Sequence, residues 1–437
     1  MKKFSLLFLL VIILLIFSQF SCNPAGPKPE RDVVLKVEDA SCTETWLKLT
    51  LNNFTGNTQV ELKRNGNTVN TFNITTADTV LYDDSLAPNN NYTYQAVELQ
   101  NGNETAKSEG ITTTTLDTTS SNFTWQTFIL GDGNSSAIHD VALINDTTAY
   151  VVGAIYYKDS TGQFDLTPYN LAVWNSKEWS IKHISFNLYD YDCSIAGSYY
   201  GNANTIYSFI YGNIIITDGT DFVKLYGASS SHYPCAINIL KGSIKKIWGK
   251  SVSDFYSVGT NGTIIHFIND TWQNIESGTT LNITDAYGAP NSSDIYMSLY
   301  NESFSLPRNS LLKFSNNNVE IQPTPDNLAE ASSIWLADDN ILFISGTGLF
   351  RRAFGTWSEI TDFGRLPINR IRGNGLNDIF VAGSHSIIAH FNGVAWTRYT
   401  DLNINNAVFG SIAAGKNIVI IAGFLYDRSI VVIGKRQ

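Results

Sequence analysis

Most of the chain consists of short apolar runs separated by turn residues. The stretch 254–272 shows the pattern well: two short runs rich in Ile, Val, Phe and Tyr are followed by Asn269-Asp270 and by a further run that starts at Trp272. A similar stretch recurs at 378–396. Runs of this length with turn residues between them predict β-strands joined by tight turns. The expected fold class is therefore all-β, with a repeated unit of several strands.

An aromatic or apolar residue that begins a strand recurs at similar intervals along the second part of the chain. The positions are Trp125, Trp179, Phe222, Trp272, Val319, Trp357 and Trp396. Their spacing is close to the roughly 40–50 residues of a four-stranded propeller blade. The last unit, residues 405–436, contains three predicted strands but no further strand that begins with Trp. The strand at Trp125, in turn, is not preceded by three strands of its own. We therefore expect these two parts to form one blade. Residues 118–437 are thus predicted to form a seven-bladed β-propeller that its N-terminal strand closes, or six blades if the unit at Phe222 is misread.

Individual motifs of the repeat support this interpretation. One unit contains Ile247-Trp-Gly249, Asp254-Phe-Tyr-Ser-Val-Gly259, Gly262-Thr-Ile-Ile-His-Phe267 and then Trp272. The series resembles the propeller repeats of exported bacterial lipoproteins, which are distantly related to photosystem II assembly-factor propellers. We interpret the repeated aromatic residues as packing between blades rather than as ligand contacts.

Residues 31–117 have a different strand spacing. Alternating apolar and polar runs occur at 34–37, 46–51, 59–63 and 92–97. They predict two small packed sheets. Leu86 and Pro88 lead to Tyr92 and Tyr94 at the start of a strand, a pattern that resembles the tyrosine corner of fibronectin type III domains. The resemblance implies a fibronectin type III-like sandwich that acts as a spacer or binding module.

The first 21 residues have the composition of a signal peptide. Two lysines precede an unbroken apolar run at 6–17, which is short for a membrane-spanning helix of ~20 residues. Ser21-Cys22 resembles the lipobox of bacterial lipoproteins, and the resemblance implies that Cys22 is acylated. The alternative is ordinary signal cleavage beside an incidental thiol. Residues 22–30 contain three prolines and are predicted to form a tether.

No catalytic constellation is visible in the sequence. Motifs of zinc hydrolases, dinucleotide-binding loops and nucleophile elbows are absent, so we expect no catalytic residue, metal or cofactor, and no enzyme activity. His266 and His390 occupy the same repeat position, which favours a structural role. Residues 132–134 and 218–221 could bind calcium, although most isolated acidic turns bind no metal ion. The alternative function is a carbohydrate-active enzyme, a glycosidase or lyase, on a propeller scaffold.

The longest connections between predicted strands are expected to share one face of the propeller. They are residues 154–170, 185–192, 226–242 and 300–309, and their candidate ligand-binding residues are Tyr156, Tyr157, Phe164, Tyr189, Tyr191, His232, Tyr233 and Tyr300. Aromatic residues on loops over a rigid scaffold are typical of a recognition surface for protein or glycan. The alternative is that they only pack the loops down. Cys193 and Cys235 either form a disulfide, which export would permit, or remain two buried thiols.

These features predict a monomeric, lipid-anchored binding protein of the cell envelope. Its partner would be a protein or polysaccharide, and its lipid anchor would attach it to a membrane. The net charge of −10 disfavours nucleic acid as a partner. We expect a location at the outer membrane or cell surface, with the periplasmic face as an alternative. A purely structural envelope component is a further possibility.

Overall fold

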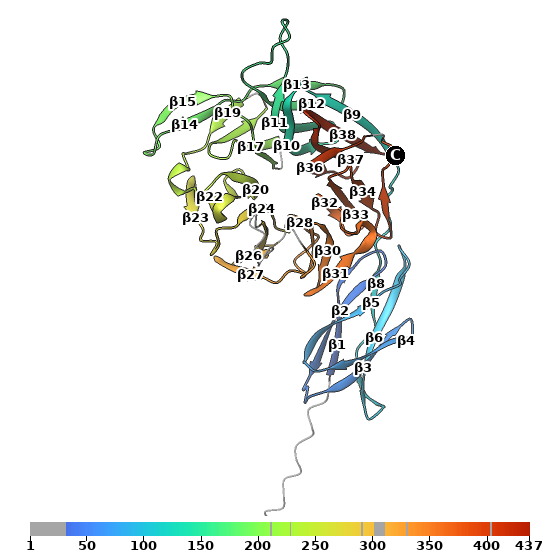
Figure 1. Cartoon of the computed structure of the whole chain (residues 1–437). Helices are drawn as coiled ribbons and strands as arrows, with labels where there is room; N and C mark the ends of the chain where they lie inside the picture. The colour runs from blue at the N-terminus through green and yellow to red at the C-terminus, as the bar shows by residue number, and fades with distance from the viewer. Residues whose placement is uncertain are drawn as a thin grey trace, which may run out of the picture. The chain divides into compact units, whose positions relative to one another are not determined.

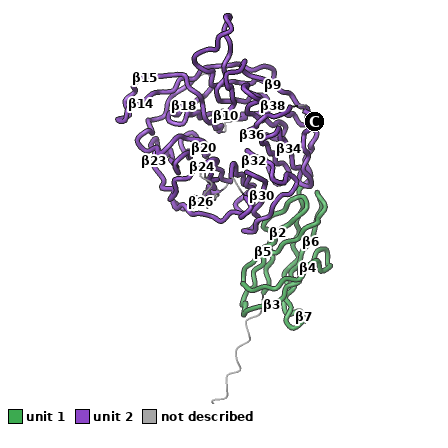
Figure 2. The backbone as a smooth tube through the Cα atoms, in the orientation of Figure 1, with its two compact units in different colours: residues 1–116 green, residues 117–437 purple. Residues whose placement is uncertain are grey.

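The computed structural model describes residues 32–209, 212–227, 229–289, 292–300, 311–328, 331–402 and 404–437. The predicted signal peptide, the tether and Cys22 lie outside these residues. The chain divides into two compact units, residues 1–116 and 117–437 (Figure 2). Apart from short 3-10 turns, the regular elements of the described part are β-strands, as the sequence predicts.

The first unit contains two antiparallel sheets. One has the order β1 (Asp32–Ala40), β2 (Thr45–Asn52), β5 (Asp78–Asp83), and the other β4 (Asn67–Ile74), β3 (Thr58–Arg64), β6 (Asn91–Gln100), β7 (Asn103–Lys107), with β8 (Ile111–Thr114) paired to β6. Alternate side chains point inward, and Leu47, Leu62 and Tyr94 share one fully buried core. The Ala87 N–H donates to the Tyr92 hydroxyl at 2.9 Å, within the turn that resembles a tyrosine corner. Kinship with fibronectin type III domains stays a prediction.

Apart from one two-stranded hairpin, the described strands of the second unit form seven four-stranded antiparallel sheets, which are arranged in a ring (Figure 1). From the innermost to the outermost strand, the first three sheets are β10 (Gly133–Asn145), β11 (Thr148–Tyr156), β12 (Tyr169–Trp174), β13 (Trp179–Lys182); β16 (Thr205–Ser208), β17 (Asn213–Thr217), β18 (Phe222–Tyr226), β19 (Ser229–His232); and β20 (Ile244–Ser251), β21 (Asp254–Gly259), β22 (Ile264–Ile268), β23 (Thr271–Asn274). The next three are β24 (Asn282–Tyr287), β25 (Ile295–Tyr300), β26 (Leu311–Ser315), β27 (Asn318–Gln322); β28 (Ala331–Leu336), β29 (Ile341–Gly346), β30 (Gly348–Ala353), β31 (Thr356–Ile360); and β32 (Ile368–Gly375), β33 (Asp378–Gly383), β34 (Ile388–Phe391), β35 (Trp396–Arg398).

The seventh sheet combines the two ends of the second unit. Its strands are β36 (Ala407–Ala414), β37 (Ile418–Leu425), β38 (Arg428–Arg436) and β9 (Phe123–Leu130). The pairing of β38 with β9 runs from Ser429 opposite Leu130 to Arg436 opposite Phe123. The sequence predicts this combination, because the last unit lacks an outer strand and the first strand lacks a sheet.

The unit around Phe222 differs from the prediction. Phe222 begins β18, the third strand of its sheet, and not an outermost strand. A separate hairpin, β14 (Phe186–Tyr189) and β15 (Ile195–Tyr199), lies between β13 and the innermost strand β16. Because this insertion lengthens the connection, counting from one aromatic residue to the next assigns Phe222 to the wrong strand.

A repeated bulge shapes the innermost strands. In β20 the register shifts between Ile244 and Lys246, and equivalent shifts occur in β10, β24, β28, β32 and β36. The bulge brings a carbonyl oxygen close to the end of the second strand. A Cβ atom on Gly259 would lie 2.0 Å from the Ser243 carbonyl oxygen, and one on Gly423 would lie 1.9 Å from that of Val408. Gly259 and Gly423 are therefore required sterically at these positions.

The repeated aromatic residues pack between neighbouring sheets. The Trp272 ring centroid lies 4.6 Å from that of Phe222 in the preceding sheet and 4.8 Å from that of Phe267 in its own sheet. The indole N–H of Trp272 donates to the Pro234 carbonyl at 2.7 Å, in the connection that joins these sheets. These contacts support the interpretation of the aromatic repeat as a packing feature.

Candidate functional site

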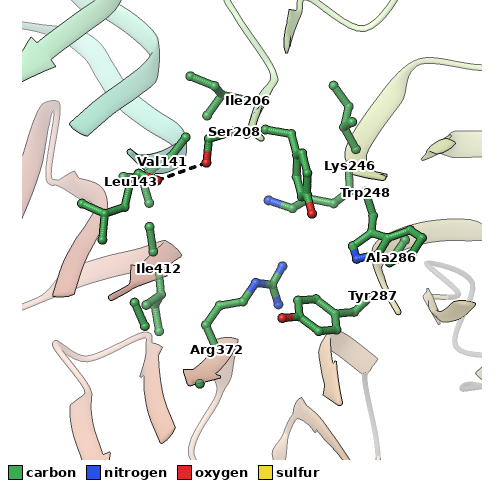
Figure 3. Close-up of a pocket in the computed structure, with 16 residues that line it drawn as sticks. Val141, Leu143, Ile206, Ser208, Lys246, Trp248, Ala286, Tyr287, Arg372 and Ile412 are labelled. Atoms are coloured by element: carbon green, nitrogen blue, oxygen red, sulfur yellow. Dashed lines mark hydrogen bonds between the residues drawn. The ribbon is translucent and has the colours of Figure 1, made fainter. Parts of the chain in front are cut away.

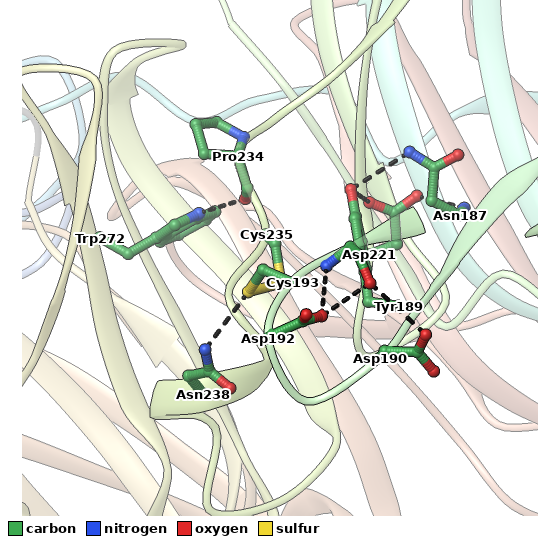
Figure 4. The surroundings of a disulfide bond; sticks show 11 residues. Asn187, Tyr189, Asp190, Asp192, Cys193, Asp221, Pro234, Cys235, Asn238 and Trp272 are labelled. Carbon is green, nitrogen blue, oxygen red and sulfur yellow. Dashed lines mark hydrogen bonds between the residues drawn. A yellow bond between two sulfur atoms is a disulfide. The ribbon is translucent and has the colours of Figure 1, made fainter. Parts of the chain in front are cut away.

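The hairpin β14–β15 lies outside the ring, beside the sheet β16–β19 (Figure 1). Phe186 anchors one end of the hairpin, since its side chain is fully buried in the core between the first two sheets. At the other end a disulfide joins Cys193 to Cys235, with a Cα–Cα distance of 5.7 Å (Figure 4). Of the two states left open by the sequence, the structure has the bonded one. The hairpin is thus held at both ends.

Asp221 fixes strand β14 of the hairpin through hydrogen bonds. Its carboxylate is buried and accepts the Asn187 backbone N–H at 2.7 Å and the Tyr189 hydroxyl at 3.2 Å (Figure 4). His232 Nδ1 lies 2.7 Å from the same carboxylate. Burial raises the pKa of Asp221, and it also raises the pKa of the Tyr189 hydroxyl. The predicted ligand residues Tyr189 and His232 are therefore brought together, with their polar atoms directed at Asp221.

Tyr233 is a core residue, and its burial does not support the predicted role in ligand binding. The side chain is buried, and its ring lies 5.3 Å from that of Phe255 and 4.9 Å from that of Phe267. The Tyr233 hydroxyl donates to the Val252 carbonyl at 2.8 Å. The residue fills the space between two sheets because the chain turns inward directly after β19.

The other predicted ligand residues are half-buried, with one exception. Tyr156, Tyr157, Phe164 and Tyr300 are all partly covered. The Tyr157 ring lies 5.8 Å from that of Tyr169, and Lys158 Nζ lies 5.1 Å from the Phe164 centroid, so these side chains pack their own loop. The exception is Tyr191, which is 92% exposed at the turn of the hairpin.

Aliphatic residues of the hairpin are exposed as well. Leu188 is 56% exposed and Ile195 63% exposed, and Tyr199 and Tyr200 are also on the surface. Leu188 and Ile195 were not among the predicted ligand residues, which were aromatic loop residues and one histidine. Phe186 and Leu188 are two residues apart, and a strand places such residues on the same face, so strand periodicity could not have separated the buried Phe186 from the exposed Leu188.

A second candidate site occupies the centre of the ring. Each innermost strand contributes a polar residue there: Asp140, Thr205, Lys246, Asp285, Ser333, Arg370 with Arg372, and Ser411. Asp140 accepts hydrogen bonds from Lys246 Nζ at 2.7 Å and from the hydroxyls of Thr205 and Ser411, both at 2.6 Å. Side chains from four different sheets thus meet at one carboxylate.

Asp285 forms the other half of this network. Both nitrogens Nη1 and Nη2 of Arg372 donate to it at 2.9 Å, and Arg370 Nη1 lies 3.0 Å away. Burial alone would raise the pKa of Asp140 and Asp285, but the neighbouring cations lower both, that of Asp140 to about 2. Burial also lowers the pKa of Lys246 to about 8, against the opposing effect of Asp140. This network was not predicted, although a polar residue precedes an apolar one at the same position of all seven innermost strands.

A cavity of about 210 Å³ adjoins the network (Figure 3). Lys246, Trp248, Tyr287 and Arg372 are among its lining residues, and Arg372 and Tyr287 point toward one another. Burial raises the pKa of Tyr207, another lining residue, to about 12. Along each contributing innermost strand, the lining residues lie at or after the polar residue, toward the turn that joins the first strand of the sheet to the second. Because strands alternate in direction, this end of the ring is opposite to the face that carries the hairpin.

A serine, a histidine and an aspartate line up near the start of β9. The Ser121 hydroxyl is 2.8 Å from His390 Nδ1, and His390 Nε2 is 2.8 Å from Asp378 Oδ1. His390 is fully buried. The same aspartate–histidine pair recurs in another sheet as Asp254 and His266, 2.7 Å apart. The pair is thus a feature of the repeat that connects the second and third strands of a sheet.

In the two acidic turns, at 132–134 and 218–221, carboxylates accept hydrogen bonds from neighbouring backbone N–H groups. Asp218 Oδ1 accepts the backbone N–H groups of Thr220 and Asp221, at 2.8 and 2.9 Å, and Asp132 Oδ2 accepts that of Lys158 at 3.0 Å. Within the described ranges, no group of three or more His, Cys, Asp or Glu residues is placed to hold a metal ion. The described part of the chain also contains no helix long and apolar enough to cross a lipid bilayer.

Comparisons with known proteins identify the fold. No protein-family model matches the chain, and no curated protein matches it significantly. Among solved structures, YCF48 from Cyanidioschyzon merolae is similar at 11% identity with a TM-score of 0.51, over 71% of this chain and 98% of that one. The WD40 β-propeller domain of Doa1 matches at 12% identity with a TM-score of 0.49, over 72% of this chain and 97% of that domain. The likeness to the first structure shows that the chain contains a β-propeller.

Proposed function

We propose that this chain is an exported, lipid-anchored binding protein that recognises a protein partner through the hairpin β14–β15. One observation carries the proposal: a hairpin fixed by a disulfide and by Asp221 presents apolar side chains to solvent. Leu188, Tyr191 and Ile195 are all exposed. Exposed apolar residues on a rigid support are typical of protein recognition, because little conformational entropy is lost when they become buried.

The free edge of β15 favours an extended polypeptide as the ligand. Among the described strands, β15 pairs only with β14. Residues 195–200 contain no charge and no proline, which are the usual protections of an exposed edge. A partner strand could therefore add to this edge through main-chain hydrogen bonds. Asp190 and Asp192 at the turn would favour a neutral or basic segment.

The proposed location rests on the N-terminal sequence and on the disulfide. A signal peptide at 1–21 and acylation of Cys22 would place the protein on the outer membrane or cell surface, with the periplasmic face as an alternative. A disulfide between Cys193 and Cys235 fits an oxidising compartment of this kind. Labelled palmitate that incorporates into the chain and is lost in Cys22→Ala would support the anchor, and incorporation that survives this change would refute it.

We also propose that the chain is not an enzyme. The aligned Ser121, His390 and Asp378 are the arrangement closest to catalytic machinery, but His390 is fully buried and its pairing with Asp378 recurs without a serine at His266. A role in packing explains both facts. Polysaccharide remains the alternative ligand, since tyrosines line the hairpin.

The test compares two isoleucines of equal exposure. Ile195 on β15 is 63% exposed, and Ile321 on β27 of another sheet is 65% exposed. A partner captured by cross-linking on intact cells is purified, and its affinity is measured for the wild type, Ile195→Lys and Ile321→Lys. We expect Ile195→Lys to weaken binding at least about tenfold, as loss of a central apolar contact does, and Ile321→Lys to have no effect.

The result also separates the alternatives. Equal affinities for the two variants would exclude the hairpin as the binding site. Binding of the wild type to a glycan array that persists in Ile195→Lys would favour a polysaccharide bound elsewhere on the loop face.

A further inference from the structure

We propose that the cavity at the centre of the ring binds a small oxyanion of the phosphate or carboxylate type. The inference is independent of the hairpin, since the cavity lies toward the opposite end of the ring. It rests on the balance of charge, on unused hydrogen-bond donors and on the walls of the cavity.

The buried network carries a surplus of positive charge. Its cations are Lys246, Arg370 and Arg372, and its anions are Asp140 and Asp285. The remaining members are neutral hydroxyls of Thr205, Ser333 and Ser411. Three cations against two carboxylates leave one positive charge among side chains that are largely shielded from water, which is unfavourable unless a further anion is present.

The cations also have donors that the protein does not use. An ammonium group has three N–H donors, whereas Lys246 Nζ hydrogen-bonds to one described residue, Asp140. Arg372 Nη1 donates to Asp285, to Ser333 and to the carbonyls of Ile334 and Ile371, while Nη2 donates only to Asp285. For Arg372 Nε no partner is found among the described residues. Both side chains line the cavity, so the unused N–H groups are available to a ligand there (Figure 3).

The cavity limits the size of that ligand. Its volume of about 210 Å³ is that of a few water molecules or one small organic molecule. Tyr207, Trp248 and Tyr287 form rigid aromatic walls, and Val141 and Ile412 are apolar. A compact anion with two or more oxygen acceptors therefore fits both the donors and the walls, whereas a cation would add to the surplus charge.

The titration of Lys246 agrees with this geometry. Burial and the two arginines lower its pKa to about 8, so the ammonium is the member of the network that loses its proton most readily. The charged groups that face it are Asp140, Asp285, Arg370 and Arg372. A bound anion would hold the proton on Lys246 and make its amine less nucleophilic.

The first test measures the reactivity of Lys246 in the full chain. The protein is treated with acetic anhydride at pH 8, at constant ionic strength set with chloride, with and without sodium phosphate or sodium acetate, and labelled peptides are quantified by mass spectrometry. Lys245 is the matched control, because it is exposed and adjacent on the same strand. We expect phosphate, acetate or both to reduce Lys246 labelling about tenfold at the concentration that occupies nine-tenths of the sites, and to leave Lys245 unchanged.

The response to the two salts identifies the type of oxyanion. Labelling of Lys246 that is unaffected by either salt up to about 10 mM, or protection of Lys245 to the same degree, would overturn the proposal. A second measurement uses thermal unfolding. Phosphate or acetate should raise the Tm of the wild type more than that of Asp140→Asn/Lys246→Met, which loses the Lys246 donors and removes one positive and one negative charge together. The labelling experiment needs no variant and decides the question even if this pair of substitutions prevents folding.

Discussion

The polar centre of the ring and the hairpin β14–β15 differ in how many repeats contribute to them. All seven innermost strands place a polar residue at the centre, at the same position of the repeat. The hairpin is inserted once, between β13 and β16. The centre therefore depends on the assembly of all the sheets, whereas the hairpin can change without altering any other sheet.

The two regions also differ in burial. Asp140 and Asp285 are buried at the centre of the ring, whereas Leu188 and Tyr191 are exposed to solvent. Substitutions at the centre should consequently affect folding, and substitutions in the hairpin should affect binding. The four predictions below test this difference.

The largest effect is expected for loss of Asp285. Asp285→Ala leaves Arg370 and Arg372 buried without their carboxylate, which should cost about 3–5 kcal/mol of unfolding free energy. Asp192→Ala is the control, because that carboxylate is exposed and bonds only within its own turn; its effect should stay within about 0.5 kcal/mol. Urea unfolding monitored by Trp fluorescence measures both. Similar losses in the two variants would contradict the comparison.

The regular spacing of aromatic residues was sufficient to predict the propeller, but the same regularity concealed the inserted hairpin β14–β15. Trp125 with no preceding strands and a last unit with no outer strand were sufficient to predict the pairing of β9 with β38. At Phe222 the spacing between aromatic residues gave the wrong strand, because the strands of the inserted hairpin have the same kind of sequence as the strands of a blade. Strand alternation indicates where strands occur, but it does not indicate which neighbour each strand pairs with.

The candidate sites were predictable only in part. Tyr191 and Tyr233 were both selected from their places in long connections, yet Tyr191 is exposed and Tyr233 is buried, because only the fold decides on which side of a sheet a residue lies. The centre was missed because Asp140, Lys246 and Ser411 differ in charge and size. Their shared position becomes apparent when the innermost strands are aligned through their bulges.

A glycine pair tests the two regions with one type of substitution. A Cβ on Gly259 would meet the Ser243 carbonyl at 2.0 Å, whereas one on Gly197 of β15 has no atom within 4 Å. Gly259→Ala should cost about 3 kcal/mol through overpacking against backbone, and Gly197→Ala should be nearly neutral. Thermal unfolding of both variants provides the measurement. A tolerated Gly259→Ala would show that the bulge of the innermost strand can move.

Acid should destabilise the centre of the ring, whereas protonation of Asp221 should not destabilise the sheet that carries it. The cations hold the pKa of Asp140 at about 2, below its usual 3.8. The stabilisation is fully present above pH 3.8 and is lost as the pH falls through 2, a change of about 2 kcal/mol at 1.36 kcal/mol per pKa unit. Burial raises the pKa of Asp221 instead, so its contribution has the opposite sign and declines as the pH rises. Urea unfolding between pH 5 and 2 should show the loss, and Asp140→Asn should reduce it.

The smallest effect on global stability is expected from the disulfide. Closure of a loop between Cys193 and Cys235, separated by 42 residues, could contribute ~4 kcal/mol if the hairpin stayed fixed without it. In Cys193→Ser/Cys235→Ser, however, the hairpin can detach at its turn while the ring remains folded, so the native state also gains entropy. The midpoint of global unfolding should then shift by less than about 1 kcal/mol, while amide exchange in β14 and β15 increases and that in β10 and β20 does not. Partner binding should weaken with it, because the exposed residues would lose their rigid support. A global loss near the full value, with uniform exchange, would mean that the hairpin is part of the cooperative fold and not an independent attachment to it.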